Sequence, residues 1–211
     1  MRRNLGALQA TQKELEAQQA ESRRLMLNIL PAVIAKEIHD HKTTEPRYYA
    51  SATILFSDIV GCTQIAEGMA PRPLVDALDN FFAAFDDIAA RFNIEKLKTI
   101  GDSYMCAAGL PEPNVNHAID ACLAALSIRA FLLRLNKDRV KFRLKPWEMR
   151  IGLHSGPVVA GIIGKQKFYY DVWGKTVNIA SRMESAGEPN RVNISGCTYE
   201  AVKHLFECED R

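Results

Sequence analysis

The sequence predicts an α+β domain with a ferredoxin-like βαββαβ antiparallel sheet, preceded by a long N-terminal helix. Segments rich in β-branched and aromatic residues alternate with segments of helical periodicity in the order β-α-β-β-α-β. That order is typical of helices packed on one face of an antiparallel sheet. Ile100-Gly101-Asp102 separates two short strands and indicates a hairpin. Residues 5–24 contain one glycine, no proline and no aromatic residue, and most of them are good helix formers.

Each element of the domain has its own signal. The first strand is expected at 50–59, and apolar residues at helical spacing from Leu74 to Ile88 predict a helix over 71–92. The other expected elements are strands at 94–99, 103–108, 148–154, 157–163, 169–173 and 191–195, and helices over 114–139, 176–185 and 198–206. Ser155-Gly156 predicts that strands 148–154 and 157–163 form a second hairpin.

Composition excludes several classes of protein. The chain has 211 residues, of which 47% are hydrophobic and 25% charged, so one ordinary domain with an appendage is expected rather than a disordered chain. The 27 basic and 25 acidic residues nearly balance, and no nucleic-acid partner is expected. No apolar run approaches the ~20 residues that span a bilayer, and no secretory signal follows Met1. Five irregularly spaced cysteines, without a CxxC pair, predict reduced thiols and a cytoplasmic location.

We divide the chain into a helical connector at 1–40, a linker at 41–49 and a domain at 50–211. In the connector, Leu8, Leu15, Ser22 and Ile29 lie seven residues apart, with Thr11, Gln18 and Leu25 between them. This weak heptad, followed by an apolar stretch at 25–34, predicts a coiled coil that pairs two chains. The alternative is a single amphipathic helix that folds onto its own domain.

Two carboxylates at strand ends are the first candidates for chemistry. Asp58 ends the first strand, and Asp102 lies at the tip of the first hairpin. If the sheet brings them together they repel each other, and a divalent cation such as magnesium or manganese relieves that repulsion. Solvated turn residues are the alternative for two such residues taken alone.

The flanking sequence favours the metal site. Four segments resemble the catalytic domain of class III nucleotidyl cyclases, in the order of that family: FSDIVGCT (56–63), KTIGDSYM (98–105), GLHSGPVVAG (152–161) and YDVWGKTVNIASRM (170–183). The resemblance covers the chain from about Ala50 to its end. It implies a head-to-tail homodimer with the active site shared at the interface, and ATP as substrate.

The resemblance also implies roles for single residues. Asp58, Asp102 and the backbone carbonyl of Ile59 would hold two Mg²⁺ ions, for which Mn²⁺ can substitute. Arg182 would reach the α-phosphate from the other subunit, and Asn178, one helical turn earlier, would orient the ribose.

The phosphate-binding part departs from the family in two places. Gly61, Cys62 and Thr63 would bind phosphate mainly through their backbone, and Cys62 stands where the family usually has Phe. The family's last hairpin, with a triphosphate-binding Lys, would follow the final helix, whereas this sequence ends at Glu207–Arg211.

Two residues predict the base. Adenine has an acceptor at N1 and a donor amine at N6, so a Lys donating to N1 and an Asp accepting from N6 suit it. Lys98 and Asp171 match this pair, while guanine-selective members carry Glu and Cys or Ser there. An adenylyl cyclase is therefore expected, with a guanylyl cyclase or a non-catalytic dimerising module as alternatives. The N-terminal helix resembles connectors to an upstream sensor or membrane domain.

Overall fold

The computed structural model describes residues 2–41, 43–164 and 168–210. The chain forms two compact units, which we describe separately: Met1–Pro46 with Gly161–Asp171, and Arg47–Ala160 with Val172–Arg211. The larger unit holds most of the sheet and nearly all of the predicted site residues.

The sheet confirms the predicted fold class. Its strands are β1 (Arg47–Ile59), β2 (Ile94–Ile100), β3 (Ser103–Ala108), β4 (Met149–Ile163), β5 (Tyr169–Trp173) and β6 (Val192–Ile194). The strand order is β2-β3-β1-β4-β5, and β6 pairs with β4 in parallel. The pairs β1–β3, β1–β4 and β2–β3 are antiparallel, as a βαββαβ unit requires.

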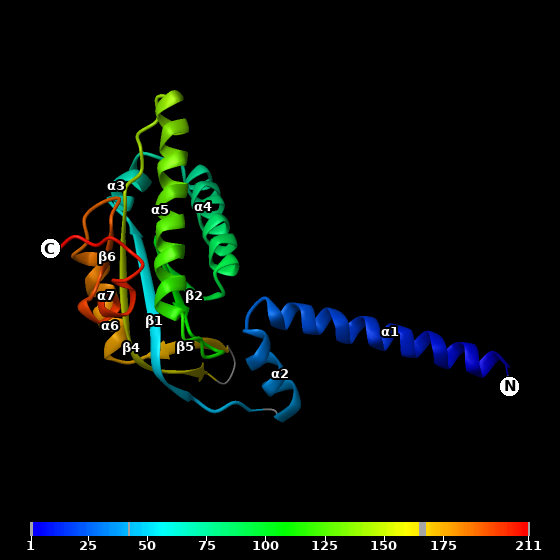
Figure 1. Cartoon of the computed structure of the whole chain (residues 1–211). Coiled ribbons are helices and arrows are strands. Elements are labelled where there is room, and N and C mark those ends of the chain that lie inside the picture. The colour runs from blue at the N-terminus through cyan, green and yellow to red at the C-terminus, as the bar shows by residue number, and fades with distance from the viewer. Residues whose placement is uncertain (1, 42, 165–167, 211) are drawn as a thin grey trace. The chain divides into compact units, whose positions relative to one another are not determined.

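Helices cover both faces of this sheet. In Figure 1, α4 (Pro71–Arg91) and α5 (His117–Lys141) lie side by side on one face. Their buried residues, among them Phe81, Phe85 and Ile128, pack with Leu55 and Tyr104 of the sheet in the main hydrophobic core. Helix α6 (Lys175–Ser185) packs on the opposite face, where a side chain at Gly152 would collide with it. Asp58 lies on this second face, where Arg150 connects it to Glu184 of α6.

The predicted hairpin around Ser155-Gly156 is wrong. Residues 149–163 form one continuous strand, and its register with β1 runs through both residues, with Thr53 opposite Ser155 and Ala52 opposite Gly156. The glycine is needed for a different reason: a Cβ at position 156 would lie 2.8 Å from Oγ1 of Thr176. A close approach of α6, and not a turn, therefore explains Gly156.

The N-terminal segment is helical, but it is not one helix. Helix α1 (Arg2–Leu27) and helix α2 (Ala32–His41) are separated by a turn that ends at Pro31. Proline has no backbone N–H and clashes with the preceding turn, so it begins a helix rather than continuing one. The expected linker is also shorter, because α2 reaches His41 and β1 begins at Arg47. No described helix is both long enough and apolar enough to cross a membrane.

The other helices differ from prediction mainly at their ends. The short helix α3 (Cys62–Glu67) was not predicted, and α7 (Gly196–Val202) ends before Phe206. All five cysteines are free thiols, with Cys197 and Cys208 exposed and Cys106 and Cys122 buried.

A chain of buried polar side chains crosses the larger unit. The hydroxyl of Thr53 lies 2.7 Å from Nδ1 of His117 and 2.7 Å from the hydroxyl of Ser155. The chain continues from Ser155 to Thr198 at 3.0 Å, from Thr198 to Ser195 at 3.2 Å, and from Ser195 to Nδ1 of His154 at 2.6 Å. These contacts join β1, β4, α5 and α7.

Candidate active site

Strand pairing brings the two predicted carboxylates together. Ser57 lies opposite Tyr104, so the end of β1 lies beside the start of β3. Asp58 is the last residue but one of β1, and Asp102 immediately precedes β3. Gly101 has a φ of +62° at the hairpin tip, a conformation that glycine adopts without strain. The tight turn therefore holds Asp102 close to Asp58.

The electrostatics of this pair suit a cation. Burial raises the pKa of Asp102, and the negative charge of Asp58 raises it further, while hydrogen bonds from the backbone and from the Cys62 thiol oppose the shift. Such mutual repulsion is what a divalent cation relieves. The Ile59 side chain is a hydrocarbon that packs in the core, so of this residue only the backbone carbonyl could serve as a ligand. In the described part of the chain no three His, Cys, Asp or Glu side chains form a metal site. Further ligands would be backbone, water or substrate oxygens.

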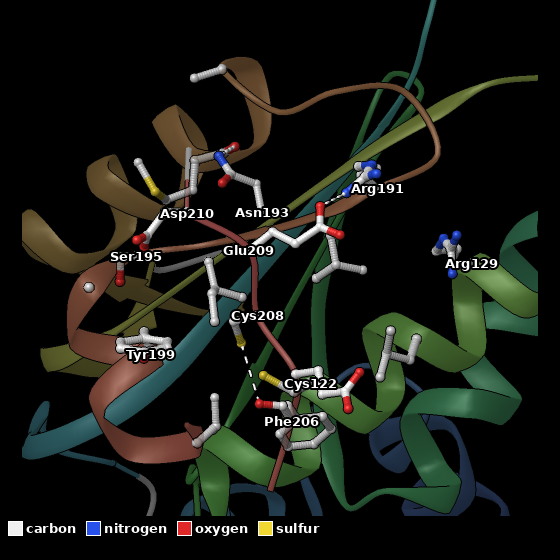
Figure 2. Close-up of a pocket in the computed structure, with 18 residues that line it drawn as sticks. Cys122, Arg129, Arg191, Asn193, Ser195, Tyr199, Phe206, Cys208, Glu209 and Asp210 are labelled. Carbon is white, nitrogen blue, oxygen red and sulfur yellow. Dashed lines mark hydrogen bonds and ion pairs between the residues drawn. The ribbon is translucent and has the colours of Figure 1, made fainter. Parts of the chain in front are cut away.

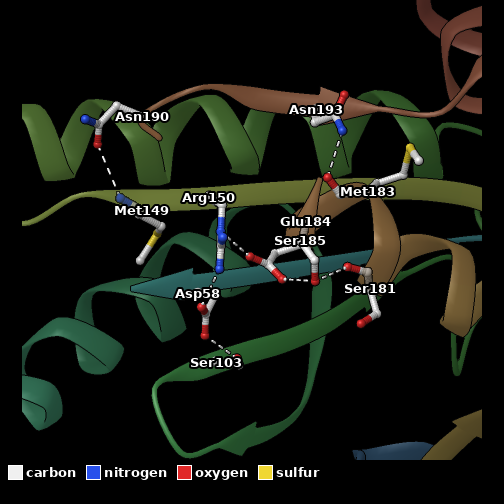
Figure 3. A network of polar contacts seen from close by, with 10 residues as sticks. All are labelled: Asp58, Ser103, Met149, Arg150, Ser181, Met183, Glu184, Ser185, Asn190 and Asn193. Atoms are coloured by element: carbon white, nitrogen blue, oxygen red, sulfur yellow. Dashed lines mark hydrogen bonds and ion pairs between the residues drawn. The ribbon is translucent and has the colours of Figure 1, made fainter. Parts of the chain in front are cut away.

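Asp58 has two partners that the sequence did not reveal. The Ser103 hydroxyl donates to its Oδ1 at 2.6 Å, and Nη2 of Arg150 donates to its Oδ2 at 3.1 Å. Nε of Arg150 also donates to Oε1 of Glu184 at 3.0 Å (Figure 3). Arg150 lies directly opposite Asp58 in the β1–β4 register, which only the strand pairing shows.

The segment expected to bind phosphate begins α3. Gly61 precedes this helix with a φ of +69°, and Cys62 and Thr63 form its first turn. Burial, followed by the nearby charge of Asp102, raises the pKa of the Cys62 thiol to about 11. Cys62 is therefore a neutral neighbour of the carboxylate pair at physiological pH.

Helix α6 presents different residues to solvent and to the sheet. Asn178 and Arg182 are exposed, and their spacing of four residues places them on one face of the helix. Glu184 is buried, with 7% of its surface exposed, and points toward Arg150. The exposed pair is available to groups outside the larger unit.

Lys98 and Asp171 are both half-buried. Lys98 lies on β2 opposite Met105, just after an irregularity in the register, and Asp171 lies on β5. They belong to different compact units, so their joint role remains a prediction. The neighbouring Lys96 has another role, because its Nζ donates to Oδ2 of Asp86 at 2.7 Å and lies over the Tyr104 ring.

A large cavity in the larger unit is lined by none of the predicted site residues. Its volume is about 1190 Å³, and it lies between α5, β6, α7 and residues 206–210 (Figure 2). Nδ2 of Asn193 on its wall donates to the backbone of Met183, and Arg191 is held by Glu209 at 2.6 Å. Neither Asp58 nor Asp102 lines this cavity.

Comparison with known proteins defines the class. Residues 44–211 match the family described as the adenylate and guanylate cyclase catalytic domain, and the chain belongs to that family. It is 38% identical over 198 residues to an adenylate cyclase of Mycobacterium tuberculosis, covering 93% of this chain and 44% of the relative. It is 40% identical over 209 residues to human guanylyl cyclase C, covering 98% of this chain and 19% of the relative. The chain thus spans less than half the length of these relatives.

Solved structures agree with the fold. The crystal structure of the adenylyl cyclase CyaB from P. aeruginosa superposes with a TM-score of 0.75 at 30% identity, covering 80% of this chain and 87% of that one. Relatives named for adenylyl and for guanylyl cyclase activity are thus similarly close.

Proposed function

We propose that this chain is the catalytic domain of an adenylyl cyclase, which converts ATP to 3′,5′-cyclic AMP and pyrophosphate. The observation that carries the proposal is the convergence of Asp58 and Asp102 at the end of β1, where their repulsion favours a cation. In the proposed reaction the ribose 3′-oxygen attacks the α-phosphorus, and the bond from that phosphorus to the β-phosphate oxygen breaks.

Some of the proposed site residues would bind metal ions, and the others would bind the nucleotide. Asp58, Asp102 and the Ile59 carbonyl would hold two Mg²⁺ or Mn²⁺ ions, which when bound lower the pKa of the 3′-hydroxyl and neutralise the triphosphate. Arg182 would donate to the α-phosphate as negative charge develops on it, where a planar and permanently charged guanidinium suits best. Asn178 would hydrogen-bond the ribose, and the backbone of Gly61, Cys62 and Thr63 would bind phosphate oxygens.

The base preference rests on Lys98 and Asp171, which would donate to N1 and accept from N6 of adenine. Guanine presents a donor at N1, so the half-buried Lys98 would face another donor, a mismatch that costs about 1–3 kcal/mol or more when the pair is shielded from water. A guanylyl cyclase is the second candidate, favoured by the 40% identity to guanylyl cyclase C.

The test is a direct comparison of the two nucleotides. The protein is incubated with ATP or GTP and Mn²⁺, and both cyclic products are quantified. We expect cyclic AMP, with kcat/KM for ATP at least roughly tenfold above that for GTP. The double variant Lys98→Glu, Asp171→Cys should shift this ratio toward GTP. Cyclic GMP as the main product of the unmodified protein would favour the second candidate, and no product from either nucleotide would favour a non-catalytic module.

We also propose a homodimer formed through the catalytic domain and the N-terminal helices. Exposed apolar side chains on the connector, including Leu15, Leu25 and Ile29, support this proposal, because pairing would bury them. Paired helices would hold two domains at high effective concentration. Deleting residues 1–40 should therefore make specific activity rise with protein concentration. Equal dimer dissociation constants with and without the segment, measured by sedimentation, would contradict this role.

A further inference from the structure

Arg150 links the carboxylate pair to helix α6. Nη2 of its guanidinium donates to Asp58 on β1, at 3.1 Å, and Nε donates to Glu184 on α6, at 3.0 Å. The side chains are largely withdrawn from solvent, with 30% of Arg150, 20% of Asp58 and 9% of Glu184 exposed. Figure 3 shows Arg150 between the two carboxylates, with a dashed contact to each. An ion-pair network this shielded is stronger than one on the open surface.

Glu184 is fixed in place by its surroundings. The Ser185 hydroxyl lies 3.0 Å from Oε2 of Glu184 and 3.0 Å from the carbonyl of Ser181, and its single proton is shared between these two acceptors. The Glu184 backbone lies against β4 so closely that a Cβ on Gly152 would stand 1.9 Å from the Glu184 nitrogen. The backbone from which the Glu184 side chain reaches Arg150 is therefore held close against the sheet.

The position of Arg150 matters for any cation at Asp58. A guanidinium can bind a carboxylate through both oxygens, and a fully paired carboxylate has fewer lone pairs left for a metal ion. Here Nε of Arg150 donates to Glu184, and Arg150 reaches Asp58 through Nη2 alone. Glu184 also offsets the positive charge that Arg150 places beside the cation site.

We propose that Glu184 is a positioning residue that holds Arg150 away from a two-oxygen pair with Asp58 and so keeps Asp58 available to divalent cations. This inference deepens the proposed function and rests on it for the role of Asp58 as a metal ligand. Glu184 lies two residues after Arg182 on α6, so the same helix supports the metal carboxylate and carries the expected α-phosphate donor.

The experiment measures metal binding without turnover. Mn²⁺ is titrated into nucleotide-free protein, and free Mn²⁺ is followed by electron paramagnetic resonance. For Glu184→Gln we expect Mn²⁺ affinity to fall about tenfold, the size of effect typical for a residue that supports a metal ligand. Glu188→Gln is the matched control, because Glu188 lies nearby but is 58% exposed and pairs only with Arg191 among described side chains. Its affinity should equal that of the unmodified protein.

A double variant separates positioning from a merely structural role. Replacing both members of a buried ion pair by apolar residues is often neutral for stability, so Arg150→Met with Glu184→Met should fold. It also removes the competing guanidinium, and its Mn²⁺ affinity should return to within about threefold of the unmodified protein. Unchanged affinity in folded Glu184→Gln, or no recovery in the double variant, would overturn the proposal. An unmodified protein that forms no cyclic nucleotide but shows the predicted affinities would contradict the proposed function alone.

Discussion

The environment of Asp102 in the folded protein disfavours the ionised form of its carboxylate. Its pKa is raised by burial and by Asp58, which means that the folded chain binds this proton more tightly than the unfolded chain does. The ionised carboxylate therefore lowers stability at neutral pH, and this cost disappears as the pH falls through the raised pKa. Such a residue is retained for chemistry more readily than for folding.

Asp102→Asn should abolish activity without weakening the fold. Loss of the carboxylate that is proposed to bind the metal should lower kcat/KM by roughly 100-fold or more, since even outer partners of metal ligands cost 10–100-fold. In metal-free buffer at pH 7, the melting temperature should stay equal or rise, because the repulsion is gone. Asp138→Asn, in an exposed pair with Lys141, is the control and should change neither quantity. Near-native activity at saturating Mn²⁺ would show that Asp102 is not a ligand.

Residues differ in how far the sequence could predict them. Asp58 and Asp102 could be found because both stand at strand ends, where local signals are clear. Arg150 and Glu184 could not, because their importance comes from the β1–β4 register and from the packing of α6. Neither feature leaves a local pattern.

Among the elements, β4 shows why glycine is ambiguous in a sequence. Gly156 suggests a turn, yet it lies inside a strand, as Gly152 does, and α6 approaches both positions closely. The break between α1 and α2 was missed for the opposite reason, since helical composition on both sides outweighed Pro31 in the prediction. Hydrophobic periodicity located the long helices α4 and α5 well, because each buries one continuous face.

Gly152→Ala should displace α6. A methyl group at this position would lie 1.9 Å from the backbone nitrogen of Glu184, a contact that only a backbone shift can relieve. We expect a loss of about 1–3 kcal/mol in the free energy of unfolding, as for other overpacked sites, and a larger relative loss of activity. Gly196→Ala is the control, because no atom lies within 4 Å of its added Cβ. Chemical denaturation measures both, and equal stability of the two variants would contradict the close packing of α6.

The chain of buried hydroxyls predicts a pH dependence of stability. Burial lowers the pKa of His117 and of His154, so both are neutral in the folded chain while the unfolded chain takes up protons below about pH 6.5. The contribution of these two neutral histidines to the free energy of unfolding is therefore complete above about pH 6.5. It is lost as the pH falls toward their lowered pKa values. In His154→Asn, whose amide can replace Nδ1, urea midpoints should fall less between pH 7 and pH 5.5 than in the unmodified protein. An equal fall in both proteins would contradict this assignment.

At the scale of the whole molecule, the sites of the proposed dimer can be tested by mixing. Asp58→Ala and Arg182→Ala should each be inactive alone. In a head-to-tail dimer of one chain of each kind, one of the two sites receives neither substitution. With random exchange, activity should recover to about a quarter of that of the unmodified protein. No recovery, with subunit exchange demonstrated independently, would indicate a site within one chain.

The fold class and the family could be predicted from the sequence, whereas the homodimer remains a prediction. Four motifs in order identified the cyclase catalytic domain, which the family match at 44–211 confirmed. The roles of Lys98 and Asp171 in recognising the base stay predictions. The chain is similarly identical to a relative named as an adenylate cyclase and to one named as a guanylyl cyclase. Base specificity also depends on how side chains are arranged around a bound nucleotide.

The distribution of thiols makes the chain suitable for site-specific labelling. Burial raises the pKa of Cys106 and of Cys122 to about 12, and the pKa of Cys62 is raised to about 11. All three therefore carry little reactive thiolate near neutral pH. A maleimide dye should therefore react first at Cys197 and Cys208, and Cys208→Ser leaves Cys197 at the start of α7 as the single fast-reacting position. Energy transfer between two such dyes would then report the spacing of two chains in solution, without a substitution at any residue proposed for the chemistry.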